Sequence, residues 1–249
     1  MSRPAPLLRS AGALAAMELR LTSRRGENVL VTIVIPVAVL LFFATVGIVP
    51  GIAGRPVDFL LPGALALGII ASGLVNLGIA TAYERSYGVL KRLGGSPLPR
   101  SGLVAAKIAS ILVLEVVQVA LLIAVAAVVL GWQPATGATP ALVVLAVLLG
   151  TFAFAGLGLL MAGTLRAELT LALANGLFLG FLMLGGIVLP VDHLPEWLAT
   201  IARVLPSSAL ADLFRVALSG TGDVVGPIVV LLAWGLGAVG LSVRFFRWE

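Results

Sequence analysis

Six long apolar runs constrain the fold of this chain more than any other feature of its sequence. They cover residues 29–49, 59–82, 102–130, 141–165, 169–189 and 224–243, and only the third contains charged residues. Each run has the length of about 20 residues that an α-helix needs to cross a bilayer. Because lipid offers the backbone no hydrogen-bond partners, such runs cross as helices. We therefore expect an all-α polytopic membrane protein, with one transmembrane domain of six helices over residues 1–249.

The composition supports a membrane protein and excludes several kinds of site. Hydrophobic residues make up 60% of the chain and charged residues 11%, whereas soluble domains are about 45–50% apolar and about 25% charged. The chain has no cysteine and one histidine, His193, so disulfides and multi-histidine metal sites are excluded. No G-x-S-x-G motif occurs. We expect neither catalytic residues nor a metal site, which leaves little support for a membrane enzyme.

The distribution of basic residues predicts the orientation in the membrane. If the N-terminus is cytoplasmic, thirteen of the sixteen Lys and Arg residues face the cytoplasm, and only Arg55, Arg203 and Arg215 face outward. This asymmetry follows the positive-inside rule and places both termini in the cytoplasm. It also explains the net charge of +5 without nucleic-acid binding.

The N-terminal residues 7–25 have an amphipathic pattern. Leu7, Leu14, Met17 and Leu21 share one side of a helix, and arginines lie on a neighbouring side. This pattern predicts a helix lying in the membrane interface. An irregular cytoplasmic tail is the alternative.

The cytoplasmic segment 83–93 between the second and third runs predicts a short amphipathic helix. Tyr83, Tyr87 and Leu90 stand at i, i+4 and i+7, so they share one helical face. Pro97 and Pro99 prevent this helix from continuing into the next span. The charged residues project elsewhere: Glu84, Arg85, Lys91 and Arg92. The segment is either a docking element for a cytoplasmic partner or a basic loop that obeys the positive-inside rule.

Polar residues within the spans are candidates for function, because they are costly in lipid and usually face protein or water. Glu115 and Gln118 lie on one face of the third span. They could bind a cation or relay protons, or they could join neighbouring helices as structural contacts. Asn76 in the second span and Asn175 in the fifth are candidates for the substrate path by location.

Two further features concern helix packing and the outer surface. Gly176 and Gly180 form a G-x-x-x-G motif in the fifth span, which permits close packing within one subunit or, alternatively, between subunits. Residues 194–218 contain two short apolar stripes separated by Pro206. We expect two helices too short to span, which either re-enter the outer leaflet or lie at its interface.

Two motifs resemble those of ABC transporter permeases of the type-two exporter family, which move drugs, polysaccharides or lipids. The first is a Glu-Arg pair and Gly followed by a basic, leucine-rich turn and a Ser-Pro-Leu-x-Arg element. It comprises Glu84, Arg85, Gly88, Leu90, Lys91, Arg92, Leu93, Ser96, Pro97, Leu98 and Arg100. The second comprises Pro190, Leu194, Pro195, Trp197, Leu198, Pro206, Asp212 and Arg215. Together with the six-run layout, the motifs cover most of the chain.

The resemblance implies a connecting helix at 7–25, a coupling helix at 83–93 and re-entrant helices before the last span. It also implies a second permease half, identical or homologous, with spans two and five lining the path. The residues implied in coupling to the ATPase are Tyr83, Glu84, Arg85, Tyr87, Gly88, Leu90, Lys91 and Arg92.

The chain lacks a phosphate-binding motif, which indicates where the energy for transport would come from. Neither lysine follows a G-x-x-x-x-G-K-[ST] pattern, so we expect ATP and Mg²⁺ to be bound by a separate ATP-binding cassette ATPase subunit. The chain would then be a permease without enzymatic activity in a bacterial plasma membrane, exporting an apolar or amphipathic substrate. The alternative is an ion-coupled carrier or channel that uses Glu115.

Overall fold

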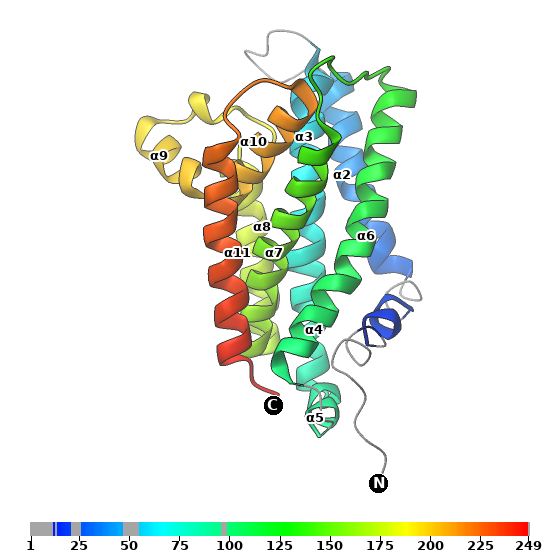
Figure 1. Cartoon of the computed structure of the whole chain (residues 1–249), viewed down its shortest axis with the longest axis vertical. Coiled ribbons are helices and arrows are strands. Elements are labelled where there is room, and N and C mark those ends of the chain that lie inside the picture. Colours follow the sequence, from blue (N-terminus) through cyan, green and yellow to red (C-terminus); the bar gives the residue numbers. More distant parts are fainter. Residues whose placement is uncertain (1–11, 13, 21–25, 47–54, 96–98, 249) are drawn as a thin grey trace.

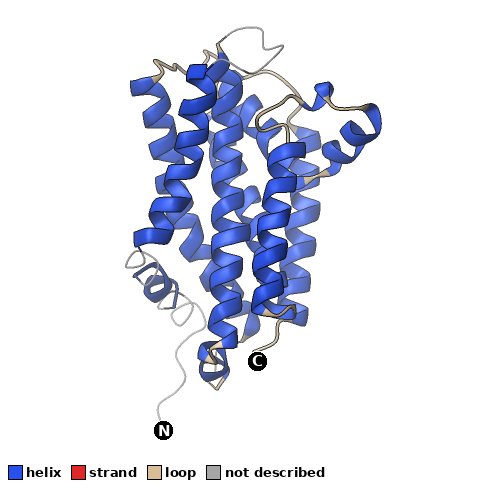
Figure 2. Cartoon of the chain, turned by 180° about the vertical axis from the view of Figure 1, so that it is seen from behind, coloured by secondary structure: helices blue, strands red, loops and turns tan. Residues whose placement is uncertain are grey.

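The computed structural model describes residues 12, 14–20, 26–46, 55–95 and 99–248, with backbone alone for 26–32, 93 and 94. All regular structure in these residues is helical, and Figure 2 shows no strand in the described part. The long helices run side by side in an elongated bundle, with α5 at one end and α9 at the other (Figure 1). We call these the α5 end and the α9 end. The expected all-α fold class is confirmed.

Five described helical segments are long and apolar enough to cross a membrane. They are Pro56–Ser86, α6 (Arg100–Val129), α7 (Pro140–Thr164), α8 (Ala167–Leu184) and α11 (Val225–Phe245). The expected run 29–49 coincides largely with α2 (Gly26–Val46), but its described apolar part, Ile33–Val46, is shorter than a span. Residues 47–49 lie outside the described residues. The count of six spans therefore stays a prediction.

The fifth span ends earlier than the run 169–189 predicts. Helix α8 stops at Leu184, and Gly186 then takes a φ of +63°, a left-handed conformation that suits glycine. The apolar residues that follow, such as Ile187, are therefore not helical. Ile187 is nonetheless 1% exposed and belongs to the hydrophobic core.

The second span is the centre of the bundle. It is one continuous helix made of α3 (Pro56–Ile70), the π-helical turn η1 (Ala71–Leu77) and α4 (Gly78–Ser86). Every residue from Leu60 to Ile70 is buried, and α2, α6, α7 and α10 all pack against α3. A helix that is apolar on all sides belongs inside a bundle. We call Pro56–Ser86 the central span.

Small residues allow the central span to approach α7 closely. A Cβ on Gly158 of α7 would lie 2.5 Å from the carbonyl oxygen of Gly73, and a Cβ on Gly73 would lie 2.8 Å from the nitrogen of Ala155. A Cβ on Gly78 would likewise lie 3.0 Å from the Cα of Gly158. Such backbone contact is the role that small residues play between membrane helices.

Two short helices precede α11, as the two stripes within 194–218 predict. They are α9 (Glu196–Val204) and α10 (Pro206–Ser219), preceded by the 3-10 turn η2 (Val191–His193). Helix α10 is largely buried against α3, α7 and α11. Helix α9 projects from the side of the bundle (Figure 1), with Trp197 and Ile201 exposed. Re-entry of these helices into the membrane stays a prediction.

The N-terminal segment joins the bundle at the α5 end. Residues 14–20 are helical, and Leu14 packs in a cluster with Leu90, Leu103, Ala106 and Phe246. This cluster ties the segment to α5 (Val89–Gly94), α6 and the end of the chain after α11. Residues 7–11, 13 and 21–25 of the predicted connecting helix 7–25 lie outside the described residues.

Replacing Gly158 by Ala tests the close approach of α7 to the central span. The added methyl group would meet backbone atoms that cannot rotate away, so we expect the free energy of unfolding to fall by about 1–3 kcal/mol. Unfolding of the purified protein in detergent measures this effect. Gly237→Ala is the matched control, because nothing lies within 4 Å of a Cβ at that position of α11. Equal stability of the two variants would contradict the packing.

Candidate functional site

The sequence predicts one coupling helix over 83–93. This prediction is wrong, because the structure divides the segment into two helices. Residues 83–86 form the last turn of α4, and α5 begins at Val89. Between them Gly88 has a φ of +73°. Glycine adopts this left-handed conformation readily, and it commonly ends a helix. Tyr87 and Leu90 therefore do not share a face: Tyr87 is 75% exposed, and Leu90 is fully buried. We call residues 83–94 the corner.

A buried ion cluster holds the inner side of the corner. The Lys107 ammonium of α6 donates to Glu84 Oε2 at 2.7 Å and to Glu18 Oε1 at 2.9 Å, and the Lys107 side chain is 1% exposed. A buried charge needs such partners to offset its desolvation. The cluster joins α4, α6 and the N-terminal segment. Glu84 is thus engaged inside the protein, which corrects its expected place on a docking surface.

The outer side of the corner presents a mixture of aromatic, apolar and basic side chains. Tyr87 and Val89 are exposed, and so are Lys91 and Arg92. The half-buried Tyr83 ring lies 6.0 Å from the ring of Tyr87. Aromatic and arginine side chains are enriched at protein interfaces. The corner therefore has a buried anchor at Leu90 and an exposed face suited to a partner.

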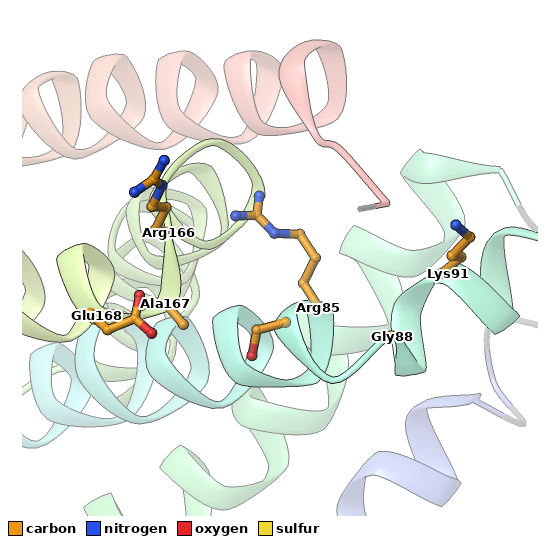
Figure 3. A pocket seen from close by; sticks show the side chains of 7 residues that line it. Arg85, Gly88, Lys91, Arg166, Ala167 and Glu168 are labelled. Atoms are coloured by element: carbon orange, nitrogen blue, oxygen red, sulfur yellow. The ribbon is translucent and has the colours of Figure 1, made fainter.

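An open hollow of about 440 Å³ lies between the corner and the turn that joins α7 to α8. Arg85 donates from Nη2 to the carbonyl oxygen of Leu165 and so connects the two walls. Figure 3 shows the Arg85 side chain extending from α4 toward the α7–α8 turn, which carries Arg166. The lining residues are Arg85, Ser86, Gly88, Lys91, Arg166, Ala167 and Glu168.

Buried polar residues in the bundle join α6 to α7 and to the central span. Glu115 is fully buried and accepts a hydrogen bond from Thr151 of α7. Gln118 Oε1 accepts from Ser72 Oγ of the central span at 2.9 Å. Gly68 makes room for the Gln118 amide, because a Cβ there would lie 2.7 Å from its nitrogen. These contacts support the interpretation that Glu115 and Gln118 join neighbouring helices as structural contacts.

The two candidate path asparagines have different surroundings. Asn76 is half-buried within the π-helical turn η1. Asn175 is exposed on α8, and its amide donates to the carbonyl oxygen of Leu171 in the same helix at 2.8 Å. This hydrogen bond of Asn175 stays within α8 and does not join α8 to a neighbouring helix. A role for either residue in a substrate path stays a prediction.

The G-x-x-x-G motif of α8 does not pack within the described part of the chain. A Cβ at Gly176 or at Gly180 would have nothing within 4 Å. The expectation of packing within one subunit is therefore wrong for the described residues, because the motif faces outward from the bundle. Contact with a second subunit stays a prediction.

The Asp–Arg pair of the second motif stabilises the α9 end. Arg215 donates to Asp212 Oδ1 at 2.6 Å and to the carbonyl oxygen of Gly186, and its guanidinium lies 4.4 Å from the Phe59 ring centroid. Burial lowers the pKa of Arg215 from its ordinary value, and the Asp212 charge opposes this effect. The pair thus anchors α10 to α3 and to the turn after α8.

Sequence reasoning missed Lys107 as the centre of an ion cluster at the α5 end. Lys107 interrupts an apolar run, and a basic residue in such a run usually has an acidic partner. That signal could have led to Glu84 or Glu18.

Lys107→Met tests the ion cluster. Removing the ammonium leaves two largely buried carboxylates without their shared partner, so we expect the free energy of unfolding to fall by about 3–5 kcal/mol. Denaturant unfolding in detergent measures it. The triple variant Lys107→Met, Glu84→Gln, Glu18→Gln should recover part of the loss, since it removes the uncompensated charges. Lys91→Met is the control on an exposed lysine; a loss as large there would argue against the cluster.

Comparisons with known proteins agree with this architecture. The sequence matches the ABC-2 type transporter family over residues 10–219. It is 29% identical over 177 residues to the putative transport permease ycf38 of Porphyra purpurea, covering 69% of this chain and 60% of that protein. It is 26% identical over 197 residues to ABC transporter G family member 20 of Dictyostelium discoideum, covering 75% of this chain and 27% of that protein. The chain thus spans less than two thirds of either relative. Since the family match covers most of its length, the chain belongs to the ABC-2 type transporter family.

Proposed function

We propose that this chain is the transmembrane subunit of an ABC exporter that a separate ATPase subunit drives. The observation that carries this proposal is the corner, an exposed aromatic and basic surface at the end of the most buried helix of the bundle. A force applied to the corner acts directly on the central span. The similarity to proteins named transport permease and ABC transporter supports the same function.

The proposed transmission of motion rests on three connections at the α5 end. Glu84 binds Lys107 of α6 and through it Glu18 of the N-terminal segment. Arg85 binds the turn between α7 and α8. Movement of the corner would therefore reach the central span, α6 and the α7–α8 turn together. The π-helical turn η1 lies further along the central span, and such turns often mark functional positions in helices.

The orientation and assembly follow from the same proposal. The bias of Lys and Arg toward the α5 end supports an orientation with that end and both termini in the cytoplasm and the α9 end outside, and we propose that the membrane is a bacterial plasma membrane. A second permease half, identical or homologous, would complete the path, with Asn76 and Asn175 as candidate lining residues. The apolar spans favour an apolar or amphipathic substrate, such as a drug-like molecule or a lipid. ATP and Mg²⁺ would be bound by the partner ATPase.

Purification of the tagged full chain from its native membrane tests the proposed function. We expect a nucleotide-hydrolysing subunit to purify with it, and vesicles containing both to move substrate only with ATP. Tyr87→Ala combined with Arg92→Glu should weaken ATPase binding at least about tenfold, or about 1.4 kcal/mol, without unfolding the protein. Solute movement by the purified chain alone, without nucleotide, would contradict the proposal.

Glu115→Gln separates the exporter from an ion-coupled carrier. The amide has nearly the shape of the carboxyl group and can keep a hydrogen bond to Thr151, so we expect ATP-driven transport to persist. Thr151→Val should cost about 0.6 kcal/mol of stability, and at most about 1.7 kcal/mol, as buried membrane hydrogen bonds do. Transport assays and unfolding in detergent measure the two effects. Abolished transport in a folded Glu115→Gln variant would favour the carrier.

A further inference from the structure

Three exposed arginines lie where α6 begins and α11 ends, at the α5 end of the bundle (Figure 1). Arg100 is the first residue of α6, Arg244 lies in the last turn of α11, and Arg247 follows that helix. The Arg100 Nη1 atom lies 3.4 Å from the carbonyl oxygen of Arg244, which places the two helix ends side by side. We call Arg100, Arg244 and Arg247 the arginine cluster.

The backbone that carries the arginine cluster is held firmly against the bundle. Phe246 is 1% exposed and packs with Leu103 and Ala106 of α6. A Cβ on Gly163 of α7 would lie 2.5 Å from the Cδ2 atom of the Phe246 ring, so the glycine makes room for this ring. The backbone nitrogen of Arg247 donates to the carbonyl oxygen of Gly163 at 3.0 Å. The chain end after α11 is therefore fixed to α6 and α7.

Neutral groups are the neighbours that the structure gives to the arginine cluster. Within the described part of the chain, the ion pairs join other residues and include none of these three arginines. The Arg100 side chain contacts a carbonyl oxygen, and the Arg244 guanidinium lies 5.7 Å from the centroid of the Phe245 ring. Because like charges repel one another, an anion bound beside them is favourable.

The length of α11 places Arg244 at the level of lipid headgroups. The helix has 21 residues, which at 1.5 Å per residue makes it about 31 Å long. This length matches the thickness of a bilayer's hydrocarbon core, which is roughly 30 Å. The last turn of α11, with Arg244, would then lie where the hydrocarbon ends and the phosphates begin.

Apolar side chains beside the arginine cluster suit the acyl chains of a lipid. Leu241 stands three residues before Arg244 and Phe245 one residue after it, and these two apolar side chains are 45% and 50% exposed. Leu241, Arg244 and Phe245 share one face of α11, since residues three and four apart are neighbours on a helix. Most of α11 is not buried within the described protein. One lipid molecule could therefore contact the apolar face and the guanidinium groups together.

We propose that the arginine cluster binds the phosphate of an anionic phospholipid of the cytoplasmic leaflet, with the acyl chains lying along α11. Arginine is suited to phosphate because it can donate two parallel hydrogen bonds, and basic pockets between spanning helices on the cytoplasmic side bind anionic headgroups. The bound lipid joins the start of α6 to the end of α11. This inference rests on the orientation in the proposed function and adds a specific lipid partner to it.

Native mass spectrometry of the purified full chain in detergent counts bound lipids and tests the inference. The probes are phosphatidylglycerol and phosphatidylcholine with the same acyl chains. We expect the chain to bind phosphatidylglycerol about tenfold more tightly than phosphatidylcholine, and less so at high salt, where charges are screened. The double variant Arg244→Gln, Arg247→Gln should lose most of this preference. Arg92→Gln combined with Arg166→Gln is the matched control, because it removes two exposed arginines of the same end and should keep the preference.

Thermal unfolding provides a second measurement. A ligand that binds the folded state stabilises it, so phosphatidylglycerol should raise the unfolding temperature of the wild-type chain more than phosphatidylcholine does. The cluster variant should lose this difference, while its unfolding temperature in phosphatidylcholine stays that of the wild type, which shows that it folds.

Three results would overturn the inference. The first is equal binding of the two lipids by the wild-type chain. The second is an equal loss of preference in both double variants, which would indicate a general attraction to net charge. The third is displacement of phosphatidylglycerol by glycerol phosphate, which would assign the cluster to a soluble phosphate. Because these measurements use the chain without an ATPase, their failure leaves the proposed function standing. The absence of an ATPase from the purified chain would contradict the proposed function and leave the lipid measurements unchanged.

Discussion

The arrangement of this bundle depends on backbone contact between the central span and α7. Gly73 and Gly158 allow the two helices to approach so closely that a single methyl group would collide with backbone atoms. Lipid supplies no hydrophobic force that would bring two apolar helices together, so this packing must come from shape and van der Waals contact. The other helices then surround the central span, and its residues from Leu60 to Ile70 are buried in protein.

The α5 end is mechanically important because the central helix of the bundle ends there. The corner continues directly from the central span, and polar contacts of Glu84 and Arg85 connect it to α6, to the N-terminal segment and to the α7–α8 turn. Buried charges hold geometry well because breaking one of their contacts leaves an uncompensated ion. In the proposed exporter, a partner that moves the corner would therefore move the bundle rather than bend a loop.

Individual residues show which structural features the sequence patterns predicted and which they did not. Apolar runs predicted the five described helices that are long and apolar enough to cross a membrane, because the cost of exposing backbone groups to lipid acts on each segment separately. Pro206 correctly separated two short helices. The predicted face of Tyr83, Tyr87 and Leu90 was wrong, because one left-handed glycine, Gly88, redirected the chain. The motif of Gly176 and Gly180 was visible in sequence, yet the glycines that bring the central span against α7 are Gly73, Gly78 and Gly158.

The sequence by itself determined the class of protein, the approximate limits of most spans and the position of the corner, since these follow from local hydrophobicity and backbone chemistry. Only the tertiary structure decided which span is central and which charges meet. Lys107 finds Glu18 at a separation of 89 residues, and Arg85 reaches Leu165 at a separation of 80. Such pairs depend on how the helices pack in three dimensions. Because the apolar helices have similar compositions, a single sequence does not indicate which of them are neighbours.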